Sequence, residues 1–392
     1  MQISDKNINA DSVREKTSLG ELAWLFLKLG TIAFGGPAAH IAMMEQEVVE
    51  RRQWLGRQRF LDLIGATSLI PGPNSTELAI HIGYERCGWA GLIVAGLCFI
   101  LPASLIVTAI AWFYVAYGKL PEVAAVLYGI KPVIIAIVVH ALWGLAKTAV
   151  KTKLLAAVGI VVLVLSFLHI NELVLLFAAG SFLVLAHWVK SRKTSAANAL
   201  LPLWLFFQTA PVTAATTFSL WALFLFFLKV GSVLFGSGYV LLAFLRGDLV
   251  ERYGWLTNEQ LLDAITVGQI TPGPVFTTAT FIGYILAGGS GALVATIGIF
   301  LPAFVFVALS GWIIPKLRKS ATMGAFLDGI NIASLALMAF VTFELGRSAL
   351  VDWITVALMA VSSILLIKFK INSAWLILAG AVIGLISVFS SR

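Results

Sequence analysis

Most of this chain consists of apolar segments that are long enough to cross a lipid bilayer. In the first half, four such segments follow one another at about 88–117, 121–146, 154–169 and 172–189. A helix of about 20 apolar residues spans the hydrocarbon core, where every backbone polar group needs a partner within the protein. Of the 392 residues, 60% are hydrophobic and 12% are charged, which excludes an ordinary soluble protein. The sequence therefore predicts an all-α polytopic membrane protein.

The second half of the chain repeats the first at a spacing of about 200 residues. The matching stretches are Phe26-Leu27-Lys28-Leu29-Gly30 with Phe227-Leu228-Lys229-Val230-Gly231, Trp54-Leu55 with Trp255-Leu256, and Leu101-Pro102-Ala103 with Leu301-Pro302-Ala303. Identity at so many separate positions indicates a duplication. The predicted organisation is a polar N-terminal tail over 1–17, a first repeat over 18–193, a connector over 194–217 and a second repeat over 218–392.

Both repeats contain helix-breaking residues where a membrane helix is expected to continue. The breaks are Phe34-Gly35-Gly36-Pro37 and Pro71-Gly72-Pro73 in the first repeat, and Phe235-Gly236-Ser237-Gly238 and Pro272-Gly273-Pro274 in the second. Glycine and proline interrupt helices, and the freed backbone groups must find partners inside the protein. Breaks at matching positions of two repeats point to a transport site. The first break is expected to interrupt one apolar helix from about 19 to the high forties, and to let backbone approach the Pro-Gly-Pro tips.

The positions of lysine and arginine predict how the two repeats are oriented. With the basic clusters at 147–153 and 190–193 placed inside, each repeat crosses the membrane five times, provided that 57–84 enters and leaves on one side. An odd number of spans makes the repeats inverted, with ten transmembrane helices in all and re-entrant Pro-Gly-Pro helical hairpins over 57–84 and 258–284. The alternative is that each hairpin segment is a full kinked span, which gives twelve spans in parallel repeats. Basic residues confined to short loops do not indicate a nucleic acid partner.

The residues after each Pro-Gly-Pro triplet start a helix and form a candidate anion site. A helix start offers free backbone N–H groups and a partial positive charge. The candidate substrate-binding residues at the breaks are Gly35, Gly36, Pro37, Asn74, Ser75, Thr76, Gly236, Ser237, Gly238, Thr277 and Thr278, and the helix-breaking residues are Pro71, Gly72, Pro73, Pro272, Gly273 and Pro274. The alternative is a tight turn in which Asn74 and Thr277 only cap the helix that follows.

Lys28 and Lys229 are charged candidates for the same site. Each lies within an apolar helix, shortly before its Phe-Gly break. A lysine inside the membrane is costly, and such residues mark functional sites by default. The alternative is that both side chains extend to the membrane interface. Two lysines together with two helix starts suit a doubly charged oxyanion better than a cation or a sugar.

Two residues near the first tip are candidates for proton coupling. Glu77 follows the first triplet and corresponds to Thr278 in the second repeat, and His40 also has no counterpart there. A buried carboxylate near an anion site can exchange protonation for substrate. The alternatives are a salt bridge or exposure at the hairpin mouth for Glu77, and an ordinary hydrogen-bonded histidine for His40.

Catalytic and metal-binding motifs do not accompany these features. The sequence lacks Gly-x-Ser-x-Gly, His-Glu-x-x-His and a phosphate-binding loop, so we expect neither enzyme activity nor a cofactor. Cys87 and Cys98 have no metal-ligand or redox spacing and are interpreted as packing residues.

A further set of motifs combines the breaks with residues between them. The set is Phe34-Gly35-Gly36-Pro37-x-x-His40, Trp54-Leu55, Pro71-Gly72-Pro73-x-x-Thr76, Gly83 and Pro102. It resembles the chromate ion transporter family in its long-chain, two-domain form, over nearly the whole chain outside 1–17 and 194–217. The resemblance implies a multi-pass protein of the bacterial inner membrane that exports chromate, confers chromate resistance and uses the proton gradient, with sulfate as a competitor. The second repeat departs from the pattern, because Ser237-Gly238 and Leu241 replace Gly36-Pro37 and His40.

Together, these features predict a carrier that moves chromate outward by alternating access. Lys28 and Lys229 are expected to neutralise its charge, the helix starts to donate hydrogen bonds, and Glu77 to couple transport to protons. Two alternatives stay open, an importer or exchanger of sulfate-like anions and an anion channel, which would give no uphill accumulation. The oligomeric state also stays open, with a homodimer as one form.

Overall fold

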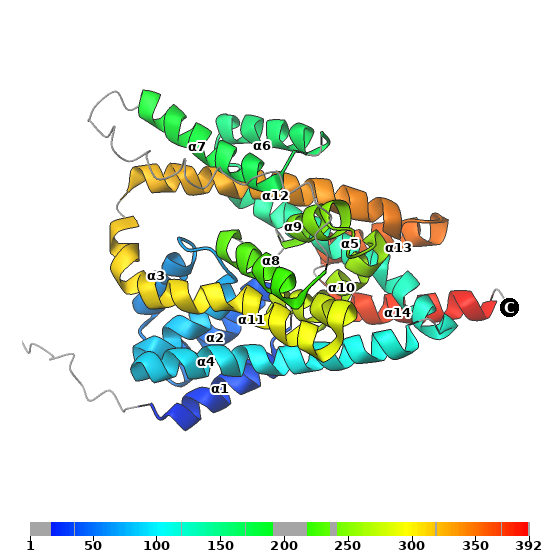
Figure 1. Cartoon of the computed structure of the whole chain (residues 1–392), viewed down its shortest axis with the longest axis horizontal. Coiled ribbons are helices and arrows are strands. Elements are labelled where there is room, and N and C mark those ends of the chain that lie inside the picture. Colours follow the sequence, from blue (N-terminus) through cyan, green and yellow to red (C-terminus); the bar gives the residue numbers. More distant parts are fainter. Residues whose placement is uncertain are drawn as a thin grey trace, which may run out of the picture.

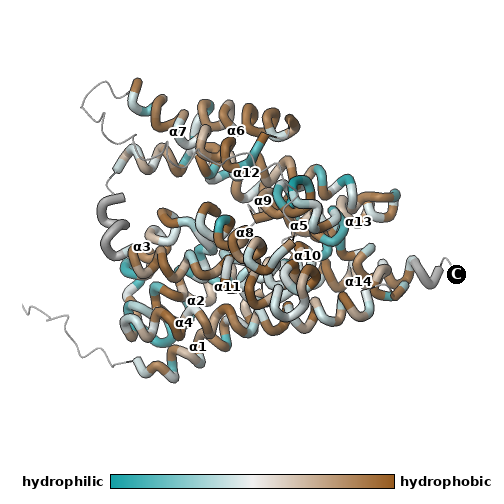
Figure 2. Tube along the Cα trace, viewed as in Figure 1, coloured by the Kyte–Doolittle hydropathy of each residue, from teal (hydrophilic) through white to brown (hydrophobic). Residues whose placement is uncertain are grey.

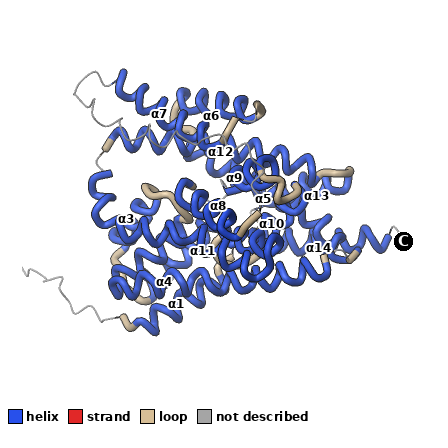
Figure 3. The backbone as a smooth tube through the Cα atoms, in the orientation of Figure 1, coloured by secondary structure: helices blue, strands red, loops and turns tan. Residues whose placement is uncertain are grey.

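The computed structural model describes residues 17–34, 36–118, 120–168, 170–190, 218–235, 241–317, 320–369 and 371–390. Its described residues form helices and no strand (Figure 3). The helices of the first repeat are α1 (Leu19–Ile32), α2 (Gly36–Glu45), η1 (Gln46–Arg51), α3 (Arg57–Thr67), α4 (Asn74–Tyr117), α5 (Pro121–Ala149), α6 (Lys153–Ser166) and α7 (Glu172–Lys190). Those of the second are α8 (Leu220–Val233), α9 (Leu241–Phe244), η4 (Leu245–Arg252), α10 (Asn258–Ile270), η5 (Val275–Thr277), α11 (Thr278–Leu317), α12 (Ala321–Ala349), α13 (Trp353–Phe369) and α14 (Ser373–Ser390).

Five of the described helical segments are long and apolar enough to cross a membrane. They are α4, α5, α12, Glu172–Val189 of α7, and Val275–Ser310, which covers η5 and most of α11. Figure 2 shows hydrophobic residues along most of their length. The structure therefore confirms an all-α protein of the membrane-spanning type. The predicted connector over 194–217 and all of the N-terminal tail except Thr17 lie outside the described residues.

The sequence predicted that the first apolar segment, from about 19 to the high forties, is one interrupted span, and this prediction is wrong. Arg86 donates to both ends of this segment, from Nε to the Thr17 hydroxyl (2.8 Å) and from Nη1 to the Trp54 carbonyl (3.0 Å). A helix rises about 1.5 Å per residue, so a single span would separate Thr17 and Trp54 by tens of ångströms. The chain reverses instead beside Gly36, which has a φ of 77°. The reversal returns α2 and η1 antiparallel to α1.

The helix α3 and the start of α4 form a second helical hairpin, with Pro-Gly-Pro at its tip. An ion pair between Arg59 and Glu85 joins the two open ends. A reversal at Cys87–Gly88, where Gly88 has a φ of 60°, then turns α4 back on itself. α11 reverses in the same way at Ala287–Gly288. Residues 57–84 therefore form a hairpin whose two ends lie together, and its re-entry from one membrane face stays a prediction.

The two repeats interlock through equivalent helices that run in opposite directions. The long second arms of α4 and α11 run antiparallel (Figure 1): Gly96, near the start of the α4 arm, lies against the Phe304 ring, and Tyr114, near its end, contacts Phe281 at a tilted angle (5.3 Å between ring centroids). Phe281 belongs to the first arm of α11, which lies beside the start of the second arm, where the Thr280 and Thr296 hydroxyls are 2.7 Å apart. In the outer layer, α5 packs along α14 and α7 packs along α12. Glycine permits both contacts: a Cβ on Gly129 would lie 2.0 Å from the Gly380 carbonyl oxygen.

Candidate functional site

The broken helix ends of the two repeats meet through two reciprocal hydrogen bonds. The Gly72 N–H donates to the Leu234 carbonyl (2.7 Å), and the Gly273 N–H donates to the Ala33 carbonyl (2.9 Å). Leu234 and Ala33 end α8 and α1, so each Pro-Gly-Pro tip binds the helix break of the other repeat. Both glycines have positive φ, 141° at Gly72 and 86° at Gly273. The two Pro-Gly-Pro tips and the ends of α1 and α8 therefore form one layer, called here the tip layer.

A cavity of about 410 Å³ reaches the tip layer between α5 and α12. Its polar lining consists of Ser68 and Asn74 near the first tip, Thr148 and Lys151 at the end of α5, and Asp328, Asn331 and Ser334 on α12, and Pro37 and Phe235 also line it. Asn74 Oδ1 and Ser334 Oγ are buried and have no hydrogen-bond partner among the described residues. Lys151 and Asp328 form an ion pair of 2.7 Å. The cavity thus offers buried polar atoms that the protein itself leaves unpaired.

The polar atoms at the two tips are partnered differently. In the second repeat, the Thr277 hydroxyl donates to the Pro274 carbonyl (2.9 Å) and the Thr278 hydroxyl to the Val275 carbonyl (2.8 Å). In the first repeat, Thr76 Oγ1 and both Glu77 carboxyl oxygens are buried without a partner among the described residues. Buried polar groups are normally hydrogen-bonded, so this unpaired set indicates a place for a ligand or a proton. Among the described residues, the equivalent side chains at the second tip, Thr277 and Thr278, are paired.

Glu77 is fully buried directly behind the Gly72 turn. A Cβ on Gly72 would lie 2.3 Å from Glu77 Oε1, so the absence of that atom makes room for the carboxyl group. An isolated carboxylate in an apolar site is costly unless it gains a proton or a partner. The two alternatives to a coupling role, a salt bridge with an arginine and exposure at the hairpin mouth, are not found for Glu77 among the described residues.

His40 links the first helix break to the start of α4. With a proton on Nε2, its ring donates to the Ala33 carbonyl (3.0 Å) and accepts from the Ser75 hydroxyl at Nδ1 (3.3 Å). The Ala33 carbonyl therefore receives hydrogen bonds from His40 and from Gly273 of the opposite repeat. Leu241 stands in the place of His40 in the second repeat, so this link exists once.

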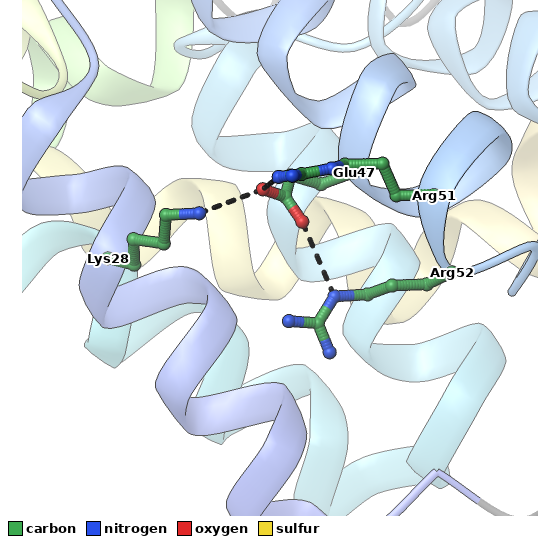
Figure 4. Close-up of polar contacts among 4 residues, drawn as sticks. All are labelled: Lys28, Glu47, Arg51 and Arg52. Carbon is green, nitrogen blue, oxygen red and sulfur yellow. Dashed lines mark hydrogen bonds and ion pairs between the residues drawn. The ribbon is translucent and has the colours of Figure 1, made fainter.

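The two predicted lysines lie in equivalent ion pairs and do not line the cavity. Lys28 Nζ lies 2.9 Å from Glu47 Oε1, and the same carboxylate binds Arg51 (3.0 Å) and Arg52 (3.5 Å), as Figure 4 shows. In the second repeat Lys229 pairs with Asp248, which Arg252 approaches to 3.7 Å. The reversal at Gly36 brings Glu47 beside Lys28. Acidic residues at these matching positions were a sequence signal for the pairing that the sequence analysis missed.

We expect Lys229→Ala to destabilise the protein more than Lys28→Ala does. Removal of Lys28 leaves Glu47 with two arginines, so the free energy of unfolding should fall by less than about 1 kcal/mol. Removal of Lys229 leaves the Asp248 side chain, which is 4% exposed, with only the distant Arg252. An undercompensated buried carboxylate of this kind costs about 3 kcal/mol. Thermal unfolding of the purified variants in detergent measures the difference, and Lys229→Ala/Asp248→Asn should recover most of it. Equal losses in the two single variants would contradict the assignment.

The structure also assigns cavity-lining residues that the sequence analysis did not select. Asp328, Asn331 and Ser334 follow one another at three-residue spacing in the apolar first part of α12, which places them on one face of the helix. This spacing was the available signal. Of the predicted residues, Pro37 and Asn74 line the cavity and Ser75 contacts His40. Gly35, Gly236, Ser237 and Gly238 lie outside the described residues.

Comparison with known proteins identifies relatives over the whole repeat structure. The family model described as chromate transporter matches residues 20–185 and again 221–385. A chromate transport protein from Cupriavidus metallidurans is 35% identical over 384 residues, which cover 94% of this chain and 93% of the relative. A probable chromate transport protein from Synechococcus elongatus is 34% identical over 378 residues, covering 94% and 95%. One from Pseudomonas aeruginosa is 31% identical over 357 residues, covering 86% and 83%. The search of solved structures gave no match.

Proposed function

Because the chain belongs to the chromate transporter family, we propose that it carries chromate out of the cell across the inner membrane. The observation that carries the proposal is the cavity at the first tip, which is lined by the unpaired Ser334 hydroxyl and by the Asn74 side chain, whose Nδ2 group can donate. Chromate is a doubly charged oxyanion whose oxygens only accept hydrogen bonds. The Asn74 amide, the Ser334 hydroxyl and the uncapped start of α4 are suitable donors for it.

The position of the cavity supports export. Lys151 at its lining belongs to the basic cluster 147–153, and such clusters lie on the cytoplasmic side. The cavity would then admit chromate from the cytoplasm and bring it to the tip layer. The clusters around Lys28 and Lys229 each contain more basic groups than carboxylates, because Lys28, Arg51 and Arg52 share Glu47, and Lys229 and Arg252 share Asp248. Their net positive charge would raise the local anion concentration at a distance.

Inverted repeats provide the framework for alternating access. The antiparallel crossing of α4 and α11 is the arrangement that two inverted copies produce, and the hairpins tipped by Pro-Gly-Pro would be re-entrant from opposite faces. The predicted total of ten spans counted the segment from about 19 to the high forties as the first span, and the reversal at Gly36 removes that span from the count. The proposed inversion therefore rests on the antiparallel crossing of α4 and α11 and not on the number of spans. Rocking of one repeat against the other across the tip layer would expose the site to each side in turn. Glu77 would take and release the coupled proton.

Uptake of radiolabelled chromate into inside-out vesicles tests the proposal. We expect uptake that a pH gradient stimulates and that unlabelled sulfate inhibits. Asn74→Ala should raise the half-saturating chromate concentration about tenfold, the value of one hydrogen bond to a charged group. Thr277→Ala is the matched control, because the Thr277 hydroxyl is already bonded to the Pro274 carbonyl. Uptake equal to that of vesicles without the protein would contradict chromate transport, and uptake of sulfate alone would favour a sulfate carrier.

A further inference from the structure

A second polar cavity, of about 600 Å³, lies at the opposite end of α5 from the first. Its polar lining includes Tyr114 of α4, Tyr128 and Lys131 of α5, Gln260 and Asp263 of α10, and Ser348 near the end of α12. The first cavity is lined by the end of α5 and the first part of α12. The second cavity is lined by the first part of α5 and the end of α12. The two cavities therefore lie at opposite ends of the α5 and α12 pair.

Lys131 lines this second cavity and is shared between two carboxylates. Its side chain is 12% exposed, and its Nζ lies 2.9 Å from Asp263 Oδ1 and 3.4 Å from Glu259 Oε1. The Tyr114 hydroxyl donates to the other Asp263 oxygen (2.8 Å). Asp263 is thus held in place by Tyr114, while the 79% exposed Glu259 side chain is a weak second partner for the lysine. A buried ammonium group with three donors faces a water-accessible space.

The duplication connects Lys131 to the first cavity. The equivalent position in the second repeat is Asn331, which lines the cavity at the first tip. One duplicated position therefore contributes a polar side chain to each cavity, an amide at one end and a lysine at the other. A substrate that crosses the tip layer would meet this position on both sides. A lysine is unusual within the apolar sequence of α5, because burying its charge is costly. A buried ion pair contributes little net stability, so stability alone does not explain the presence of Lys131.

We propose that Lys131 forms a second oxyanion site, which chromate occupies on its way out by displacing the lysine from Asp263. This site rests on the function proposed above. The competing carboxylates make it weaker than a free lysine would be, and a release site requires binding that is weak enough for the anion to leave. Tyr114 keeps Asp263 in position, so Lys131 returns to it once the anion has gone.

Opposite effects at the two partners of the pair distinguish this site from a structural ion pair. In right-side-out vesicles, the face of the protein that carries Lys131 is in contact with the external medium. Exchange of labelled chromate, measured at increasing external concentrations, gives the half-saturating chromate concentration at that face. Lys131→Gln should raise this value about tenfold or more, and Lys131→Arg should keep it within about threefold of wild type. Glu259→Gln should lower it about twofold, because one competing carboxylate is removed. In inside-out vesicles, all three variants should bind chromate as the wild type does.

A structural ion pair gives a different pattern. Glu259→Gln would then leave the value unchanged or raise it, and Lys131→Gln would impair both faces equally, and either result overturns the proposal. If Lys131→Gln fails to fold, Glu259→Gln and Lys131→Arg decide the matter, since the exposed Glu259 side chain makes no other described contact that folding needs. Wild-type vesicles without chromate exchange would contradict the proposed function itself, which separates the two failures.

Discussion

Replacement of Glu77 by glutamine is expected to leave chromate transport in place and to remove its response to a pH gradient. The carboxyl group is fully buried, has no partner among the described residues and lies directly behind the tip that the substrate would approach. A charged carboxylate without a partner is costly at such a buried position, and binding a proton is the simplest way to neutralise it. Glutamine keeps the shape and cannot titrate. Chromate uptake into inside-out vesicles, measured with and without the gradient, should then differ by less than about twofold.

The same substitution separates coupling from folding. Glutamine removes a buried unpaired acid, so the unfolding temperature of Glu77→Gln in detergent should equal or exceed that of the wild type. Glu85→Gln is the matched control, because Glu85 belongs to the same helical arm but already pairs with Arg59. It should keep the full response to the gradient. A gradient response that survives in Glu77→Gln would contradict the coupling role and direct attention to His40.

The two Pro-Gly-Pro breaks could be predicted from the sequence more fully than the first break could. Glycine and proline inside apolar segments require partners for the freed backbone groups, and their duplication indicated one shared site. The identity of the partners could not be predicted. Gly72 binds Leu234 and Gly273 binds Ala33, and these contacts between distant residues exist only because the two repeats interlock.

The error at the first helix break led to the incomplete account of the lysines. If the first break is interpreted as a kink, Lys28 lies in a long membrane span without an acidic partner. Its side chain is then free to bind an anion. As a reversal, it returns η1 beside α1 and places Glu47 within 2.9 Å of the lysine. The residues before and after the break show the same apolar pattern whether the helix is kinked or the chain reverses. The pattern therefore cannot distinguish the two cases. The positive φ of Gly36 makes the difference, and a sequence with two adjacent glycines permits either conformation.

Gly273→Ala is expected to abolish transport and to destabilise the protein by more than about 2 kcal/mol. A Cβ at this position would lie 2.5 Å from the Ala103 Cβ and 3.3 Å from the Gly30 carbonyl, and the residue would keep a φ of 86° that alanine disfavours. The backbone must shift, and the bond from its N–H to the Ala33 carbonyl would be lost with it. Unfolding in detergent and chromate uptake in vesicles measure the two effects.

Substitutions at two other glycines distinguish the cost of the positive φ from the cost of the steric contact made by the new Cβ. Gly288→Ala carries the cost of positive φ alone, about 1 kcal/mol, because its Cβ would meet open space. In Gly72→Ala the new Cβ would meet the end of the Glu77 side chain, which can turn away more readily than the Ala103 backbone can move. The loss of stability should therefore fall in the order Gly273→Ala, Gly72→Ala, Gly288→Ala. Displacement of Glu77 should nevertheless reduce the gradient response in Gly72→Ala. A stable Gly273→Ala protein with normal uptake would contradict the view that the repeats are joined through the tip layer.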